Sequence, residues 1–216
     1  MNPWSQQAWE AALPVYRKIL EHPFVNELAS GCLPEDKFRF YLQQDSLYLA
    51  SYSRVLSHIA ARLTRREHIA AFIRFASDGI AVEEALHRSY LQQDFTDPKA
   101  VSPTCLLYTS VLGSQATAPV EVEAAAVLPC FWIYQQVGRH ILARQKDTDN
   151  PYRQWIQTYA DPAFEQSTAQ AIALCDQLAA QAHAVLRQRM TDIFVLCTRM
   201  EWMFWDSAYR MESWEI

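Results

Sequence analysis

The sequence predicts a single all-α domain that spans residues 1–216 and contains seven or eight helices. Half of the residues are apolar, and they recur every three to four positions along nearly the whole chain, which is the spacing of one helix face. Only 4 of the 216 residues are glycine, whereas the tight turns of sandwiches and barrels need many. The sequence shows no sustained two-residue alternation and no linker long enough to separate two domains.

The first clear helix begins at Pro34, where a proline in the first turn is followed by two acids at the positive end of the helix dipole. A second long helix is expected from about Arg65 to Gln93, because Thr96-Asp97-Pro98 interrupts the pattern after it. The apolar face of the first is Phe38, Tyr41, Leu42, Leu49, Tyr52, Val55, Leu56 and Ile59. That of the second is Ile69, Phe72, Ile73, Ala76, Ile80, His87 and Leu91.

The remaining helices follow from proline start signals and further apolar stripes. They are expected from near Pro103 to about Gly113, from Pro119 to about Arg144, around Trp155 and Ile156, from Asp161-Pro162 onward, and from about Thr191 to Met211. The most polar connector in this half of the chain is the segment from Asp147 to Pro151.

Charge and cysteine usage exclude several classes of protein. The net charge is −5 and the basic residues are scattered, so nucleic acid is not an expected partner. The sequence has no apolar stretch long enough for a membrane span. The 5 cysteines have no C-x-x-C spacing, which argues against a zinc ribbon or a secreted disulfide framework. We expect no signal peptide and a cytoplasmic location.

Two acids interrupt apolar helix faces, where an unpaired charge costs several kcal/mol. Asp45 shares its face with Tyr41, Tyr48 and Tyr52, and Glu201 falls within a later stripe. A tyrosine or arginine contact would explain a buried Asp45 without any function. The alternative is that the two acids form a substrate anchor and a general acid/base. Burial among aromatic residues would raise the pKa of Glu201.

Cys130 lies in the segment Leu128-Pro129-Cys130-Phe131-Trp132. Free cysteine is most often buried and inert, so both a core role and a nucleophilic role stay open. Pro129 removes a backbone donor, which predicts a local irregularity in the helix. Glu84 and His87 form a Glu-x-x-His pair, which is half of a helical di-metal site, but the sequence holds no second such pair.

Five segments that contain Asp45, Cys130 and Glu201 follow one another along residues 40 to 210. In this order they resemble the signatures of the thiaminase II (TenA) family, and Cys130 indicates its cysteine-containing branch. The segments are Phe40-Tyr41-Leu42-Gln43-Gln44-Asp45-Ser46-Leu47-Tyr48-Leu49, Leu107-Tyr108-Thr109, Leu128-Pro129-Cys130-Phe131-Trp132-Ile133-Tyr134, Trp155-Ile156-Gln157-Thr158-Tyr159 and Glu201-Trp202-Met203-Phe204-Trp205-Asp206-Ser207-Ala208-Tyr209.

The resemblance implies a haem-oxygenase-like helical bundle and an aminopyrimidine aminohydrolase of thiamin salvage. Such enzymes convert 4-amino-5-aminomethyl-2-methylpyrimidine to the hydroxymethylpyrimidine and ammonia, and many also cleave thiamin to pyrimidine and thiazole. Family members are usually homotetramers and need no metal or organic cofactor.

The resemblance also assigns roles to residues of this sequence. Cys130 would be the nucleophile that adds to the pyrimidine ring. Glu201 would move protons to the leaving group and from water. Asp45 would hold the 4-amino group and a ring nitrogen. Stacking and orienting residues of the pocket would be Tyr48, Tyr52, Tyr108, Tyr134, Tyr159 and Phe204.

Two other functions are compatible with the sequence. One is a di-metal oxidase of the haem-oxygenase-like fold, with Glu84 and His87 as ligands. The other is a non-catalytic pyrimidine-binding protein, which would bind tightly without turnover.

Overall fold

The computed structural model describes residues 2–90, 101–144 and 149–215, apart from the side chains of residues 83 and 87–89. Those ranges hold nine α-helices and a short 3₁₀ turn at Gln115–Thr117, with no strand, so the predicted all-α class is confirmed. The helices are α1 (Trp4–Leu20), α2 (Pro23–Ser30), α3 (Glu35–Arg62), α4 (Arg66–Tyr90), α5 (Pro103–Ser114), α6 (Val120–Arg144), α7 (Arg153–Ala160), α8 (Pro162–Gln181) and α9 (Ala184–Arg210). The number exceeds the expected seven or eight because α1 and α2 form before Pro34, the start of the first predicted helix.

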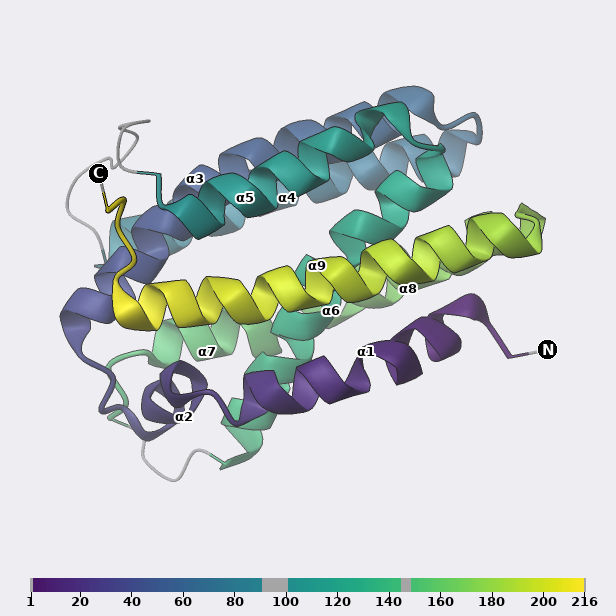
Figure 1. The fold of residues 1–216 in the computed structure, drawn as a ribbon. Coiled ribbons are helices and arrows are strands. Elements are labelled where there is room, and N and C mark those ends of the chain that lie inside the picture. The colour runs from purple at the N-terminus through teal and green to yellow at the C-terminus, as the bar shows by residue number, and fades with distance from the viewer. Residues whose placement is uncertain (1, 91–100, 145–148, 216) are drawn as a thin grey trace.

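Long helices pack around one hydrophobic core. Helices α3, α4 and α5 lie together along one side, and α9 crosses the molecule against α6 (Figure 1). Helix α1 lies along α9, while the shorter α7 packs on α6 and α8. Helix α6 contacts α3, α7, α8 and α9, so it is the central element of the bundle. In the described part of the chain, none of the helices combines the length and apolar character needed to cross a membrane.

The predicted helix boundaries are mostly confirmed, but the last helix starts well before Thr191. It begins at Ala184, because the His183 ring nitrogen Nδ1 accepts a hydrogen bond of 3.2 Å from the Leu186 amide and caps the helix. Pro129 does not interrupt its helix either, since α6 is continuous from Val120 to Arg144. A proline can be tolerated in a helix interior when surrounding packing compensates for the lost donor.

The apolar face assigned to α4 is partly wrong. Phe72 and Ala76 are buried, but Ile73 and Ile80 are 56% and 46% exposed. These two isoleucines flank a surface groove between α3 and α4. Helical spacing alone assigns more residues to the apolar face of α4 than this helix buries against the core.

Helices α6 and α7 approach closely at Gly138. A Cβ atom there would lie 2.8 Å from the backbone carbonyl of Tyr159, which is a steric clash with backbone atoms. The glycine is therefore required by space rather than by backbone conformation. One turn earlier on α6, the ring of Tyr134 consequently lies 4.9 Å from that of Tyr159, measured between centroids.

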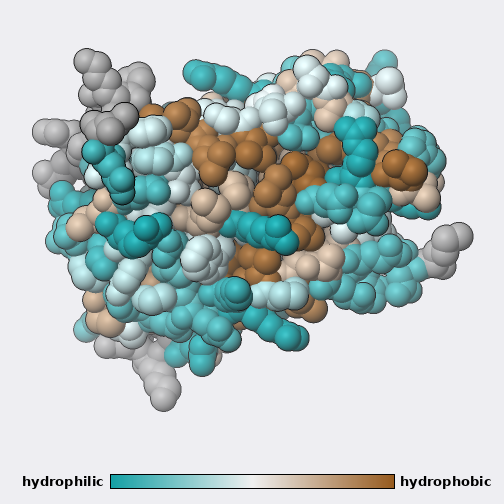
Figure 2. Space-filling view, viewed as in Figure 1, coloured by the Kyte–Doolittle hydropathy of each residue, from teal (hydrophilic) through white to brown (hydrophobic). Residues whose placement is uncertain are grey.

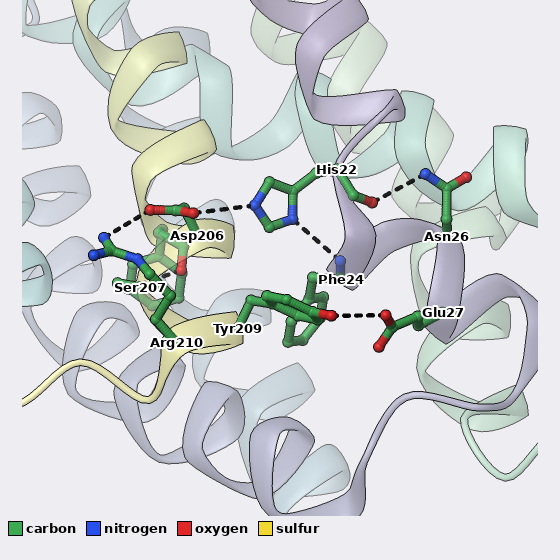
Figure 3. Close-up of polar contacts among 9 residues, drawn as sticks. His22, Phe24, Asn26, Glu27, Asp206, Ser207, Tyr209 and Arg210 are labelled. Carbon is green, nitrogen blue, oxygen red and sulfur yellow. Dashed lines mark hydrogen bonds and ion pairs between the residues drawn. The ribbon is translucent and has the colours of Figure 1, made fainter.

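The C-terminal end of α9 is attached to α2, as Figure 3 shows. His22 caps α2 by accepting the Phe24 amide at its Nδ1 atom, so its Nε2–H points to Asp206 at 3.5 Å. Asp206 is also paired with Arg210, one turn further along α9, at 2.7 Å. These contacts anchor the end of the helix that carries Glu201.

Candidate active site

A cavity lies between α3, α4, α6, α7 and α8, and it holds about 610 Å³ of atom-free space with its mouth included. Five of the nine predicted site residues line it: Asp45, Tyr52, Cys130, Tyr134 and Tyr159. The topology therefore brings together residues from three helices, α3, α6 and α7, that are far apart in the sequence.

The other four predicted residues form a layer behind the cavity wall rather than lining it. Tyr48, Tyr108 and Phe204 pack against one another, with the Tyr48 ring 4.8 Å from Tyr108 and 5.8 Å from Phe204. The Tyr108 hydroxyl donates a hydrogen bond of 2.7 Å to Oε1 of Glu201. We call Tyr48, Tyr108, Glu201 and Phe204 the rear aromatic layer, and the Glu201 carboxyl is buried within it.

Glu201 is 1% exposed, and this burial raises its pKa from the usual 4.5 to about 8. The hydrogen bond from Tyr108 opposes the rise by stabilising the carboxylate, but it is the smaller effect. At pH 7 the protonated form of Glu201 is therefore favoured. The side chain is available to donate a proton near neutral pH, as its position on the apolar stripe predicted.

Cys130 is half-buried and opens onto the cavity. Burial raises the pKa of its thiol well above the usual value, and the charges of Glu201 and Asp45 raise it further. The hydroxyls of Tyr48 and Tyr52 act in the opposite direction, because they hydrogen-bond to the sulfur when it is charged. The resting site thus holds a neutral thiol, and the nucleophile must lose its proton during the reaction.

The two tyrosines that face Cys130 differ in their remaining contacts. The Tyr52 hydroxyl donates a hydrogen bond of 2.8 Å to the Val127 carbonyl on α6. The Tyr48 hydroxyl is buried and has no hydrogen-bond partner in the ground state among the residues that the structure describes. An unpaired buried donor is costly, so Tyr48 is a donor ready for a charged sulfur or a bound ligand.

A second set of aromatic residues fixes the opposite wall. The Trp155 indole N–H donates to the Tyr41 hydroxyl at 3.3 Å, and the Tyr41 hydroxyl donates to that of Tyr134, also at 3.3 Å. Trp155 is fully buried, and its ring lies 4.7 Å from the ring of Tyr159. The Tyr134 and Tyr159 side chains on the cavity are therefore held by buried neighbours.

Asp45 is the acidic group of the cavity wall on α3, and its side chain is 5% exposed. Its negative charge acts on groups of α6 across the cavity, because it raises the pKa values of both Cys130 and Tyr134. A carboxylate beside an aromatic slot can accept two hydrogen bonds from a flat heterocycle and fix its register. The anchoring role of Asp45 stays a prediction, which its position in the cavity wall allows.

Sequence reasoning missed the residues at the mouth of the cavity. Phe75, Asp78 and Val82 of α4 and Phe164 and Ser167 of α8 all line it. The apolar ones are indistinguishable from core residues by periodicity, and Asp78 has the pattern of an ordinary solvent-facing acid. No local signal in the sequence could have separated them.

The alternative di-metal site receives no support from the described residues. Glu84 is exposed on α4, and the side chain of His87 lies outside the described residues. Within the described ranges there is no group of three or more His, Cys, Asp or Glu side chains placed to hold a metal ion.

The family model described as the TENA/THI-4/PQQC family matches residues 9–211. The chain belongs to this family. The aminopyrimidine aminohydrolase of Bacillus subtilis (strain 168) is 34% identical over 218 residues, which cover 98% of this chain and 92% of the relative. The thiamine biosynthesis multifunctional protein ThiED of Corynebacterium efficiens is also 34% identical, over 99% of this chain, but the chain spans only 29% of that protein.

A comparison of structures gives the same family. The TenA homologue protein from P. horikoshii OT3 superposes with a TM-score of 0.83 at 25% identity, covering 97% of this chain and 99% of that one. The bundle that surrounds the cavity is therefore the fold of this TenA homologue.

Proposed function

We propose that this chain is an aminopyrimidine aminohydrolase of thiamin salvage, which converts 4-amino-5-aminomethyl-2-methylpyrimidine to the hydroxymethylpyrimidine and ammonia. The single observation that carries the proposal is the position of Cys130, whose thiol opens onto an aromatic cavity within electrostatic reach of Asp45 and Glu201. The similarity to the named B. subtilis enzyme over nearly the full chain supports the same activity. Thiamin, which carries a thiazolium on the same methylene, is a second substrate in this proposal.

The first step is addition of the thiol to the pyrimidine ring. Asp45 accepts hydrogen bonds from the 4-amino group and a protonated ring nitrogen, which makes the ring electrophilic. As the bond from Cys130 sulfur to a ring carbon forms, the thiol proton is transferred to the ring, so total charge is conserved. The Tyr48 hydroxyl, which donates to no other described residue, stabilises the negative charge that develops on the sulfur.

The second step exchanges the substituents on the methylene. The electron-rich ring adduct expels the ammonium group as ammonia, and the released ammonia takes a proton from Glu201. The Glu201 carboxylate then accepts a proton from water as that water adds to the methylene. Cleavage of the carbon–sulfur bond returns a proton to Cys130 and restores the aromatic ring. Thiol and acid are thereby regenerated.

Ammonia release from the aminomethylpyrimidine tests the proposal. Wild-type protein should release ammonia and form the hydroxymethylpyrimidine, while Cys130→Ser should be inactive. Cys32→Ser is the matched control, because Cys32 is exposed and does not line the cavity. Full activity of Cys130→Ser would refute the covalent mechanism, and binding without any turnover by the wild type would indicate a pyrimidine-binding protein instead.

We further propose that the protein is a cytoplasmic homotetramer formed by one domain per chain. A reducing compartment preserves the free thiol that the reaction uses. Figure 2 shows apolar side chains gathered over α5 and along the seam between α5 and α9. Exposed large apolar residues of these helices are Leu106 and Leu107 on α5 and Leu196 on α9. Subunit contacts would cover such a patch. Sedimentation equilibrium checks this, and Leu107→Glu should weaken the assembly if this patch is the interface.

A further inference from the structure

A second hollow lies directly outside the cavity. It is bounded by α4, by α7 and by the start of α8, and it opens to solvent with about 1210 Å³ of atom-free space. We call this hollow the vestibule. The cavity and the vestibule share Asp78, Val82, Phe164 and Ser167, so they are two parts of one continuous passage. A ligand that enters by this passage meets these four side chains before it reaches Cys130.

All charged side chains that line the passage are acidic. They are Asp45 in the cavity, Asp78 at the shared neck and Asp161 in the vestibule. Among the described residues that line either hollow there is no lysine, arginine or histidine. The passage therefore has a negative potential, which concentrates cations and disfavours anions.

The two acids of the vestibule are not equivalent. Asp161 accepts a hydrogen bond of 2.7 Å from the Ala163 amide and caps α8, so the positive end of the helix dipole offsets its charge. Asp78 is exposed, and no hydrogen bond or ion pair joins it to another residue in the described part of the chain. Asp78 therefore contributes an uncompensated negative charge at the neck.

The charges of the proposed substrates and of the product indicate what the negative charge at the neck does. The aminomethylpyrimidine carries an ammonium group near neutral pH, and thiamin carries a thiazolium. The hydroxymethylpyrimidine product is neutral. A negative neck consequently attracts both substrates but does not retain the pyrimidine product.

We propose that the vestibule is an encounter site for cationic pyrimidines, and that Asp78 is the residue that makes the enzyme prefer a charged substrate over its neutral product. The inference rests on the proposed function, because it assigns a role at the entrance to the same site. Asp78 is a specificity residue here and takes no part in bond making or breaking.

The test compares charged and neutral ligands of the same ring in wild type and Asp78→Asn. At about 20 mM salt, the variant should lose about fivefold in kcat/KM for both thiamin and the aminomethylpyrimidine, with kcat unchanged. The inhibition constant of the hydroxymethylpyrimidine should stay within about twofold. At about 0.5 M salt the loss should disappear, because counterions screen an exposed charge. Asp78→Lys should lose more than Asp78→Asn.

Asp192→Asn is the matched control. Asp192 is an exposed acid on α9 that lies outside the passage, so its removal changes the net charge equally and should leave kcat/KM unaffected. An unchanged kcat/KM in Asp78→Asn would overturn the inference, and so would an equal loss for the neutral product. Wild-type protein that turned over neither substrate would instead refute the proposed function, and the inference with it.

Discussion

Glu201→Gln should abolish ammonia release and at the same time make the folded protein more stable at pH 8. The folded pKa of Glu201 is about 8, against 4.5 for an ordinary glutamate, because the side chain is buried. Between these two pH values the unfolded chain has released the proton and the folded chain has kept it. The stability of the wild type therefore falls as the pH rises through this window. Glutamine does not titrate, so the variant lacks this loss.

The size of the effect follows from the width of the window. Each pH unit above 4.5 costs the wild type about 1.4 kcal/mol of stability until Glu201 ionises in the folded state. The cost is about 3 kcal/mol at pH 7 and levels off near 5 kcal/mol above pH 8. For a chain of this length, 3 kcal/mol corresponds to a rise in Tm of roughly 6–12 °C.

Urea unfolding of both proteins at fixed concentration, in steps from about pH 5 to pH 8.5, measures the difference in the free energy of unfolding. The difference between variant and wild type should grow with pH, while Glu10→Gln, an exposed site on α1, should show a constant difference. A Glu201→Gln difference that does not vary with pH would refute the reasoning, because it would mean that the buried carboxyl has an ordinary pKa. The wild-type kcat/KM should also decline above about pH 8, as the acid form of Glu201 is lost.

Three further substitutions test separate features. Tyr48→Phe removes a hydroxyl that has no hydrogen-bond partner in the ground state among the described residues. The kcat should fall about 100-fold with no loss of stability. An unchanged kcat would exclude a role for this donor towards Cys130. Gly138→Ala should lower the free energy of unfolding by about 1–3 kcal/mol in urea and raise KM, because the new Cβ displaces Tyr159. A variant more stable than the wild type would contradict the close approach of α6 and α7. His22→Asn keeps a cap for α2 but removes a buried ring whose pKa is lowered mainly by burial. The wild type should therefore lose stability as the pH falls below about 6.5 and the variant should not, which thermal unfolding at several pH values would show.

The chemistry of the site was easier to predict than its shape. Asp45 and Glu201 stood out because an acid on an apolar stripe is rare and visible in one helix, and the structure places both in buried positions. Helix class and most boundaries also depend on local patterns. Features that depend on contacts between distant helices were not predictable: the exposure of Ile73, the neck residue Asp78 and the spatial need for Gly138.

The rear aromatic layer illustrates the same limit. The family resemblance implies that Tyr48, Tyr108 and Phe204 line the pocket. In the structure Tyr108 hydrogen-bonds to Glu201, Tyr48 packs against Tyr108 and Phe204, and none of the three is among the residues that line the cavity. The sequence pattern identifies aromatic residues near the acid, but only the packing of α3, α5 and α9 decides which of them face the cavity.

The buried contact between Trp155 and Tyr159 gives the site an optical signal. The indole is enclosed by protein, while the phenol ring 4.7 Å away forms part of the cavity surface. A flat heterocycle that stacks on Tyr159 changes the electronic surroundings of this indole without touching it. Intrinsic fluorescence and near-ultraviolet circular dichroism can therefore follow ligand entry in the unlabelled protein, even in variants that no longer turn over substrate.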